Sequence, residues 1–131
     1  MFIVLQGNGR RLLIVDDEPA IRRALKRWFE RRGWSADEAA DGKAALDRLL
    51  VAGGDYALII SDLKMPGLNA IELHRRLRAE RPELFRLFLF STGDLASPEA
   101  ASFLQETSCP VLEKPFEFEV LAATAARLCA A

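Results

Sequence analysis

The chain has 131 residues, half of them hydrophobic, and a formal net charge of −1 at pH 7. This length is typical of one domain with its own hydrophobic core, and we expect no second module. The near-neutral charge gives no general electrostatic reason to bind nucleic acid or an anionic membrane directly.

The two cysteines, Cys109 and Cys129, belong to neither a CxxC nor a Cys/His spacing. The sequence therefore predicts reduced thiols rather than a disulfide framework or a zinc site. No apolar stretch approaches the roughly 20 residues of a membrane span, and residues 1–5 are too short for a signal-peptide core. We therefore expect a cytoplasmic protein.

Residues 1–10 begin with a short apolar run and continue through Gln6-Gly7-Asn8-Gly9, which is typical of a flexible turn. We expect these ten residues to form a leader or linker outside the core fold. The domain itself is then expected to occupy residues 11–131.

Short apolar runs alternate with amphipathic segments along the rest of the chain, which predicts five strands and five helices. The strands are expected at residues 11–15, 34–39, 56–62, 85–91 and 109–114. The helices are expected at 19–33, from 42 to the Gly53-Gly54 pair, from 70 to a break at Pro82, from 98 onward, and at 117–129. Strands joined by helical crossovers run parallel, so the pattern predicts a doubly wound α/β domain with helices on both faces of one sheet.

Two of the predicted strands end in carboxylates. Asp16-Asp17-Glu18 follows the first strand, and Asp62 closes the third before the Met65-Pro66-Gly67 turn. Open parallel sheets bind ligands outside the carboxyl ends of their strands, so these acids are expected to meet at one edge and to suit Mg²⁺. We expect Glu18 to be a helix-terminal charge rather than a direct ligand, because an acid there complements the helix macrodipole.

The fourth and fifth strands bring a hydroxyl and an ammonium group to the same edge, from Thr92 and Lys114. An aspartate can attack phosphorus to form an acyl phosphate if a cation offsets the repulsion between the oxygens. A hydroxyl and an ammonium group can then bind the oxygens of the transferred group. The pattern favours phosphoryl chemistry with Asp62 as the acceptor.

These residues in this order resemble a response-regulator receiver domain of two-component signalling, over about residues 11–129. The resemblance implies a flavodoxin-like (βα)5 fold with strand order 2-1-3-4-5. It also implies a phosphorelay switch that receives a phosphoryl group from a phosphohistidine on Asp62 and changes its partner-binding surface. Such a domain is a phosphoacceptor that promotes its own phosphotransfer and dephosphorylation, rather than an enzyme that acts on a separate substrate.

The resemblance also implies the cofactor and its ligands. Asp17 and Asp62 would bind Mg²⁺ directly together with the backbone carbonyl of Lys64, and Asp16 would act mainly through a bound water. The implied cofactor is therefore Mg²⁺.

The remaining site residues would surround the phosphoryl group. Thr92 and Lys114 would bind its oxygens and carry the switch. Thr92 is preferred to Ser91 because the family's hydroxyl residue directly precedes a small residue, which is a glycine here. The side chains of Lys64 and Asp94 would flank the path of the hydrolytic water and so tune the lifetime of the phosphoryl group.

Three further positions carry expectations. Lys114-Pro115 resembles the family's cis peptide, which costs less before proline than elsewhere. Val111 stands where the family often has an aromatic switch residue, so we do not expect a rotating-ring signal there. His74 has no Cys or His partner at a metal-binding spacing, and we expect it to be a surface residue.

The implied partners are a sensor histidine kinase or a phosphotransfer domain and a downstream protein that the sequence does not identify, while a homodimer is left open. Partner binding is expected on the first helix, or on the last helix and the edge near Val111. The first helix carries a dense basic array, Arg22, Arg23, Lys26 and Arg27. This array is either a solvated face or a surface that steers an acidic partner.

Two other functions share part of this pattern. A phosphatase of the haloacid-dehalogenase type also uses a strand-end aspartate with Mg²⁺, but it requires Asp-x-Asp on its first strand, and Lys64 stands two residues after Asp62. An interaction module that works without phosphorylation is disfavoured because all five site residues are present. The short leader resembles the last strand of a histidine-kinase ATP-binding domain, so both a stand-alone regulator and a piece of a hybrid kinase remain open.

Overall fold

The structure, a computed structural model, describes residues 5–51, 55–63 and 70–130. The strands are β1 (Arg11–Val15), β2 (Ser35–Ala39), β3 (Leu58–Asp62), β4 (Phe88–Thr92) and β5 (Val111–Glu113). The helices are α1 (Pro19–Glu30), α2 (Gly42–Leu50), α3 (Ala70–Glu80), α4 (Pro82–Phe85), α5 (Pro98–Glu106) and α6 (Phe118–Ala130). Within the described ranges, no helix combines the length and apolarity that a membrane crossing requires.

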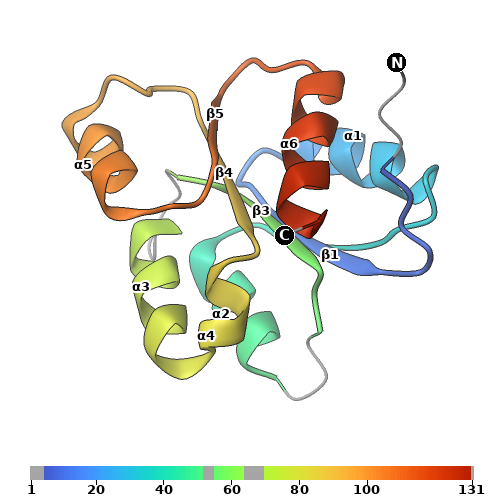
Figure 1. Ribbon diagram of the computed structural model, residues 1–131, viewed down its shortest axis with the longest axis horizontal. Helices are drawn as coiled ribbons and strands as arrows, with labels where there is room; N and C mark the ends of the chain where they lie inside the picture. Colours follow the sequence, from blue (N-terminus) through green and yellow to red (C-terminus); the bar gives the residue numbers. More distant parts are fainter. Residues whose placement is uncertain (1–4, 52–54, 64–69, 131) are drawn as a thin grey trace.

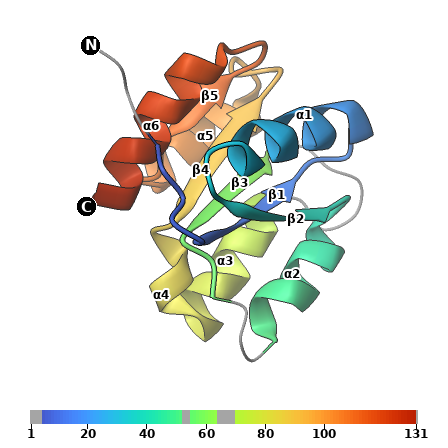
Figure 2. The same cartoon turned by 90° about the vertical axis from the view of Figure 1, so that its right-hand side faces the viewer.

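The five strands form one parallel sheet in the order β2-β1-β3-β4-β5, which confirms the predicted fold class. Helices α1 and α6 cover one face of the sheet, and α2, α3, α4 and α5 cover the other (Figures 1 and 2). Each connection between neighbouring parallel strands therefore crosses one face of the sheet, as the alternating sequence pattern predicts.

Two apolar clusters, one on each face, hold the helices to the sheet. On β1, Leu12 and Ile14 point into the cluster beneath α1 and α6, whereas Leu13 and Val15 point into the cluster beneath α2, α3 and α5. Successive side chains of a strand face opposite sides of the sheet, so a strand covered on both faces needs apolar residues at every position. This is why the central strands are mostly continuous apolar runs, with polar residues only at the first position of β1 and the last two positions of β3 and β4.

The region around Pro82 differs from the prediction. The residues Pro82–Phe85 form the short helix α4, and strand β4 starts at Phe88 rather than at Phe85. Pro82 lies in the first helical turn, where its fixed φ and missing N–H are tolerated. The proline therefore starts a helix here instead of marking a break, and the described residues contain a sixth helix.

The expectation that the leader lies outside the core is wrong for Leu5, whose exposure is only 3%. The indole Nε1 of Trp34 donates to the Leu5 carbonyl at 3.1 Å, and the backbone N–H of Gly7 donates to Arg32 O at 2.7 Å. Residues 5–10 therefore pack against the turn between α1 and β2. Met1 to Val4, which the prediction also included, lie outside the described residues.

His74 is buried, with 3% exposure, so its predicted surface position is wrong. Its ring centroid lies 5.1 to 5.7 Å from those of Phe88, Phe90 and Phe103, and its Nε2 lies 3.8 Å from Cys109 Sγ. Ala70, His74 and Leu77 share one face of α3 because residues three and four apart lie above each other on a helix. The spacing of His74 from the apolar residues Ala70 and Leu77 thus indicates that His74 faces the core.

We expect Gly7→Ala to destabilise the domain by about 1 to 3 kcal/mol, because a Cβ at Gly7 would lie 2.5 Å from the backbone of Gly33. Urea denaturation followed by tryptophan fluorescence measures the change. Gly93→Ala is the matched control, since a Cβ there meets nothing within 4 Å. Equal stability of Gly7→Ala and the wild type would mean that residues 5–10 do not belong to the folding unit.

Candidate functional site

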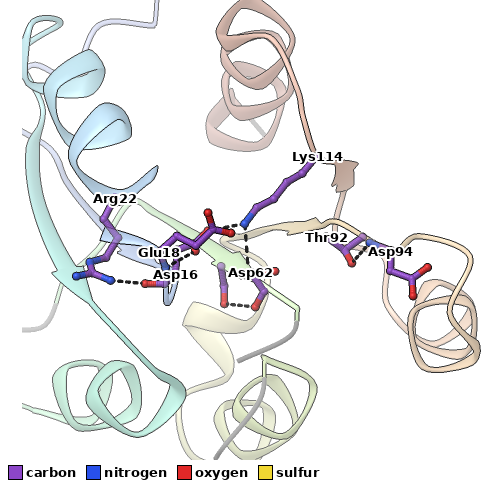
Figure 3. Close-up of polar contacts among 8 residues, drawn as sticks. Asp16, Glu18, Arg22, Asp62, Thr92, Asp94 and Lys114 are labelled. Carbon is purple, nitrogen blue, oxygen red and sulfur yellow. Dashed lines mark hydrogen bonds and ion pairs between the residues drawn. The ribbon is translucent and has the colours of Figure 1, made fainter. Parts of the chain in front are cut away.

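The carboxyl edge of the sheet brings together side chains from four strands (Figure 3). Asp16 directly follows β1, Asp62 ends β3, Thr92 ends β4 and Lys114 directly follows β5. One carboxylate oxygen from each of Asp16, Asp17 and Asp62 lies within 4.8 Å of the others. This arrangement confirms the prediction that acids from two strands lie together at this edge.

Backbone hydrogen bonds between neighbouring strands continue past the strand ends and hold these residues. The N–H of Asp16 donates to Ala39 O at 3.1 Å, and the N–H of Lys114 donates to Thr92 O at 2.8 Å. The N–H of Leu63, the residue after Asp62, donates to Ser91 O at 2.8 Å. The site therefore rests on the sheet ladder rather than on free loops.

Lys114 bridges two of the acids. Its Nζ lies 2.7 Å from Asp16 Oδ2 and 3.3 Å from Asp62 Oδ2. Burial by itself lowers the pKa of the Lys114 ammonium, but the hydrogen bond to Asp16 and the charge of Asp62 outweigh burial, so the pKa is raised. The ammonium thus supplies positive charge to an otherwise acidic cluster.

The three aspartates differ in their surroundings. Asp16 and Asp62 are buried, whereas Asp17 is exposed. Asp16 is further fixed because its Oδ1 accepts from the backbone N–H of Glu18 at 2.9 Å. Glu18 is the N-cap residue of α1, where a negative charge complements the helix dipole, as expected from the sequence.

Thr92 and Ser91 are both buried at the end of β4. The Thr92 hydroxyl accepts a hydrogen bond from the backbone N–H of Asp94 at 3.1 Å. Figure 3 shows that pair on the far side of Lys114 from Asp16, with the Asp94 carboxylate pointing away from Asp62. The structure therefore places Thr92 at the predicted edge but turns its hydroxyl toward its own loop.

Two other sequence-based expectations concern the loops beside the edge. The Lys114-Pro115 peptide bond is cis, as the resemblance implied. Lys64, whose carbonyl and side chain were both given roles, lies outside the described residues.

A mostly apolar groove of about 450 Å³ lies between α1 and the connection from β5 to α6, next to Lys114. The residues that line it are Glu18, Ile21, Ala24, Leu25, Gly93, Lys114, Pro115, Phe116 and Phe118. The groove runs along α1 and reaches the edge at Lys114. The sequence predicted a partner surface on the first helix, or on the last helix and the edge near Val111. It did not predict the groove, because the walls of the groove come from distant segments.

The four basic residues of the array on α1 differ in exposure and in their contacts. Arg23 and Arg27 are exposed, but the Arg22 side chain is only 16% exposed and its Nη1 donates to Asp16 O at 2.6 Å. Arg22 Nε also lies 3.1 Å from Glu38 Oε1, and Lys26 Nζ lies 3.9 Å from Glu38 Oε2. Arg22 is therefore part of the structure around the acids rather than a solvated charge.

The fold and the site together define a flavodoxin-like α/β domain with an acidic, lysine-bridged edge that suits a divalent cation. A family model described as the response regulator receiver domain matches residues 12–126. The sensor kinase CckA of Brucella abortus is 32% identical over 120 residues, which cover 92% of this chain and 12% of that protein. The chain spans between 12% and 53% of the length of several curated relatives.

Solved structures agree. The signal receiver domain of a signal transduction histidine kinase from Syntrophus aciditrophicus has a TM-score of 0.80 at 28% identity, with 93% of this chain and 91% of that one covered. The response regulator protein TrrA of Thermotoga maritima, solved in complex with Mg(2+)-BeF, has a TM-score of 0.74 at 30% identity, with 91% and 98% covered. The chain belongs to the response regulator receiver domain family of two-component signalling.

We expect Lys114→Met to destabilise the domain by about 3 kcal/mol at pH 7, because it leaves Asp16 and Asp62 buried without their cation. The pKa of Lys114 is raised in the folded state, so its contribution is complete below its ordinary value of 10.5 and is lost as pH rises through the higher folded value. The stability difference between wild type and variant should therefore persist at neutral pH and shrink in strong alkali.

Urea denaturation between pH 7 and pH 11 measures this difference. Lys43→Met on α2 is the control, because Lys43 is an exposed lysine. A Lys114→Met variant as stable as the wild type at pH 7 would contradict the electrostatic role of the bridge.

Proposed function

We propose that this receiver domain is a phosphoacceptor switch, in which Asp62 receives a phosphoryl group from the phosphohistidine of a sensor histidine kinase or a phosphotransfer domain. The observation that carries the proposal is the cluster of Asp16, Asp17 and Asp62, with Lys114 bridging two of them at the carboxyl edge. A single residue of this kind is common at a strand end, but a strand-end acid, two further acids and a lysine brought together from three separate segments suit phosphoryl transfer.

In the proposed reaction, one oxygen of the Asp62 carboxylate attacks phosphorus. The bond between phosphorus and the partner's histidine nitrogen breaks, and that nitrogen leaves with the electron pair of the bond. The products are an acyl phosphate on Asp62 and a free imidazole on the partner. No oxidant or reductant is involved.

The donor set fits Mg²⁺, because hard carboxylate oxygens from Asp16, Asp17 and Asp62 lie within one ion's reach. Receiver domains bind this ion at an acidic site, and the relative TrrA was solved with Mg(2+)-BeF. Asp17, Asp62 and the carbonyl of Lys64 would hold the ion, with Asp16 acting through a water. When bound, the ion offsets the repulsion between the Asp62 carboxylate and the phosphoryl oxygens.

Lys114 and Thr92 would then respond to the added group. The Lys114 ammonium already lies 3.3 Å from Asp62 Oδ2, so it can bind an oxygen of the phosphoryl group without a large movement. We propose that the Thr92 hydroxyl turns from the N–H of Asp94 to donate to that group. This exchange would change the loop between β4 and α5, and we propose it as the first step toward a changed partner surface.

The partner's phosphohistidine would enter beside Lys114, where the apolar groove reaches the acidic edge. We propose that a helix of the donor protein lies in this groove, since apolar walls and a charged end suit an amphipathic helix. The exposed cations Arg23 and Arg27 on α1 would steer an acidic donor surface.

A phosphatase of the haloacid-dehalogenase type is disfavoured. It requires Asp-x-Asp on its first strand, whereas Asp62 lies on β3 and the matched relatives are response regulators and a sensor kinase receiver. An interaction module that works without phosphorylation is disfavoured because the fold brings the acids together. Steady hydrolysis of a small phosphomonoester would favour the phosphatase, and failure to accept any phosphoryl group would favour the module.

Asp62→Asn should abolish phosphorylation by acetyl phosphate while the domain stays folded, because the amide keeps nearly the same volume but is not a nucleophile. Intact-protein mass spectrometry after incubation with acetyl phosphate and Mg²⁺ measures the added group. Asp47→Asn, at an exposed position of α2, is the control and should be labelled like the wild type. Stoichiometric labelling of Asp62→Asn would show that Asp62 is not the acceptor.

Replacing Arg23 and Arg27 with glutamine should slow phosphotransfer from a sensor kinase that labels the wild type, by about tenfold at low salt, because electrostatic steering raises association rates. Arg22 is kept because it contacts the backbone of Asp16. Labelling by acetyl phosphate should be unchanged, since that small donor does not dock on α1. Equal losses with both donors would instead indicate a damaged site.

The lifetime of the phosphoryl group should depend on Lys64, whose long side chain we propose to shield the approach of water. Lys64→Ala should accelerate hydrolysis, and a tenfold change needs only about 1.4 kcal/mol. The measurement is the decay of radiolabelled phosphoprotein in excess Mg²⁺ after the donor is removed. Equal or slower decay in Lys64→Ala would rule out this shielding.

A further inference from the structure

We propose that Arg22 is a positioning residue for the cation site, which holds the peptide unit between Asp16 and Asp17 in the orientation that cation binding requires. The inference rests on the proposed function, because it takes Asp17 as a direct ligand. It assigns Arg22 to the phosphoryl-transfer apparatus, whereas the sequence left the basic array open as either a solvated face or a partner-steering surface.

The contacts of Arg22 are unusual for a residue on the first turns of a surface helix. One nitrogen, Nη1, donates to the backbone carbonyl of Asp16 at 2.6 Å, and Nε donates to Glu38 Oε1 at 3.1 Å. Figure 3 shows Arg22 reaching Asp16 from the α1 side while Lys114 reaches it from the other. The guanidinium is a planar fork, so two fixed acceptors define its orientation.

The first contact acts on Asp17 through the peptide plane. The carbonyl of Asp16 and the N–H of Asp17 lie in one plane, so fixing the oxygen also fixes the direction in which the Asp17 backbone leaves. On the two sides of this peptide, the Asp16 N–H donates to Ala39 O and the Glu18 N–H donates to Asp16 Oδ1. Asp17 is exposed, and the hydrogen bond from Arg22 restrains the peptide unit next to it.

The second contact anchors the fork to the sheet. Glu38 lies on β2 opposite Ile14 of β1 in the parallel register, so its backbone is held in the sheet beside the strand that ends at the acids. Lys26 lies 3.9 Å from the other oxygen of Glu38 and helps to hold that carboxylate in place. Arg22 thus connects a rigid strand to the turn that carries the cation ligands.

A purely electrostatic role for Arg22 predicts the opposite result of a substitution. Removing a positive charge near three carboxylates raises the local negative potential, which would strengthen Mg²⁺ binding. Loss of positioning weakens binding, because a ligand that must be ordered at the moment of binding costs conformational free energy. The sign of the change in affinity therefore separates the two roles.

The experiment measures Mg²⁺ affinity of the unphosphorylated domain by isothermal titration calorimetry, with urea stability recorded for every variant. Arg22→Gln should bind Mg²⁺ about tenfold more weakly than the wild type, in the range found when groups that orient metal ligands are removed. Arg22→Lys should not restore the affinity, since a lysine keeps the charge but not the fork. Glu38→Gln should show a smaller loss in the same direction.

Arg31→Gln, at the opposite end of α1, is the control for removal of one positive charge and should leave the affinity unchanged. Asp17→Ala, which removes the proposed ligand, sets the scale of a full loss. A folded Arg22→Gln with equal or tighter Mg²⁺ binding would overturn the inference, and so would full rescue by Arg22→Lys. A wild type that binds no Mg²⁺ would instead overturn the proposed function.

Discussion

The concentration of negative charge at one edge of the sheet is the constraint on which the rest of the site depends. Parallel strands all end at the same edge, so acids that close different strands are forced together. Like charges at such distances oppose folding unless a cation lies among them. Lys114 supplies that cation, and its contacts at 2.7 and 3.3 Å to Asp16 and Asp62 join β5 to β1 and β3.

The same contacts place an ammonium where a phosphoryl group would develop its charge. A group that compensates repulsion in the unphosphorylated domain is therefore already close to the position that the proposed reaction needs. Preorganised charge of this kind reduces the reorganisation that would otherwise oppose transfer. The stability of the fold and the proposed chemistry thus share one interaction.

The surroundings of the site divide into a rigid part and a part that can change. The acids are tied to the ladder of the sheet, whose central strands are buried on both faces. Thr92 ends β4 and is tied to its own loop through Asp94, and the ring of Phe90 on the same strand packs 4.9 Å from that of Phe103 on α5. A movement at the end of β4 would therefore change the packing of α5 against the sheet.

The fold class and the residues at the carboxyl edge could be predicted from local signals, because an apolar run that ends in an acid or a lysine shows both the strand and the group that it delivers. The strand order followed only from the family resemblance. The burial of His74, the docking of Leu5 and the contact of Arg22 with Asp16 were decided only by the tertiary structure. Each depends on partners from distant segments or on which helix face meets the sheet, and a pattern of neighbouring residues does not specify such contacts.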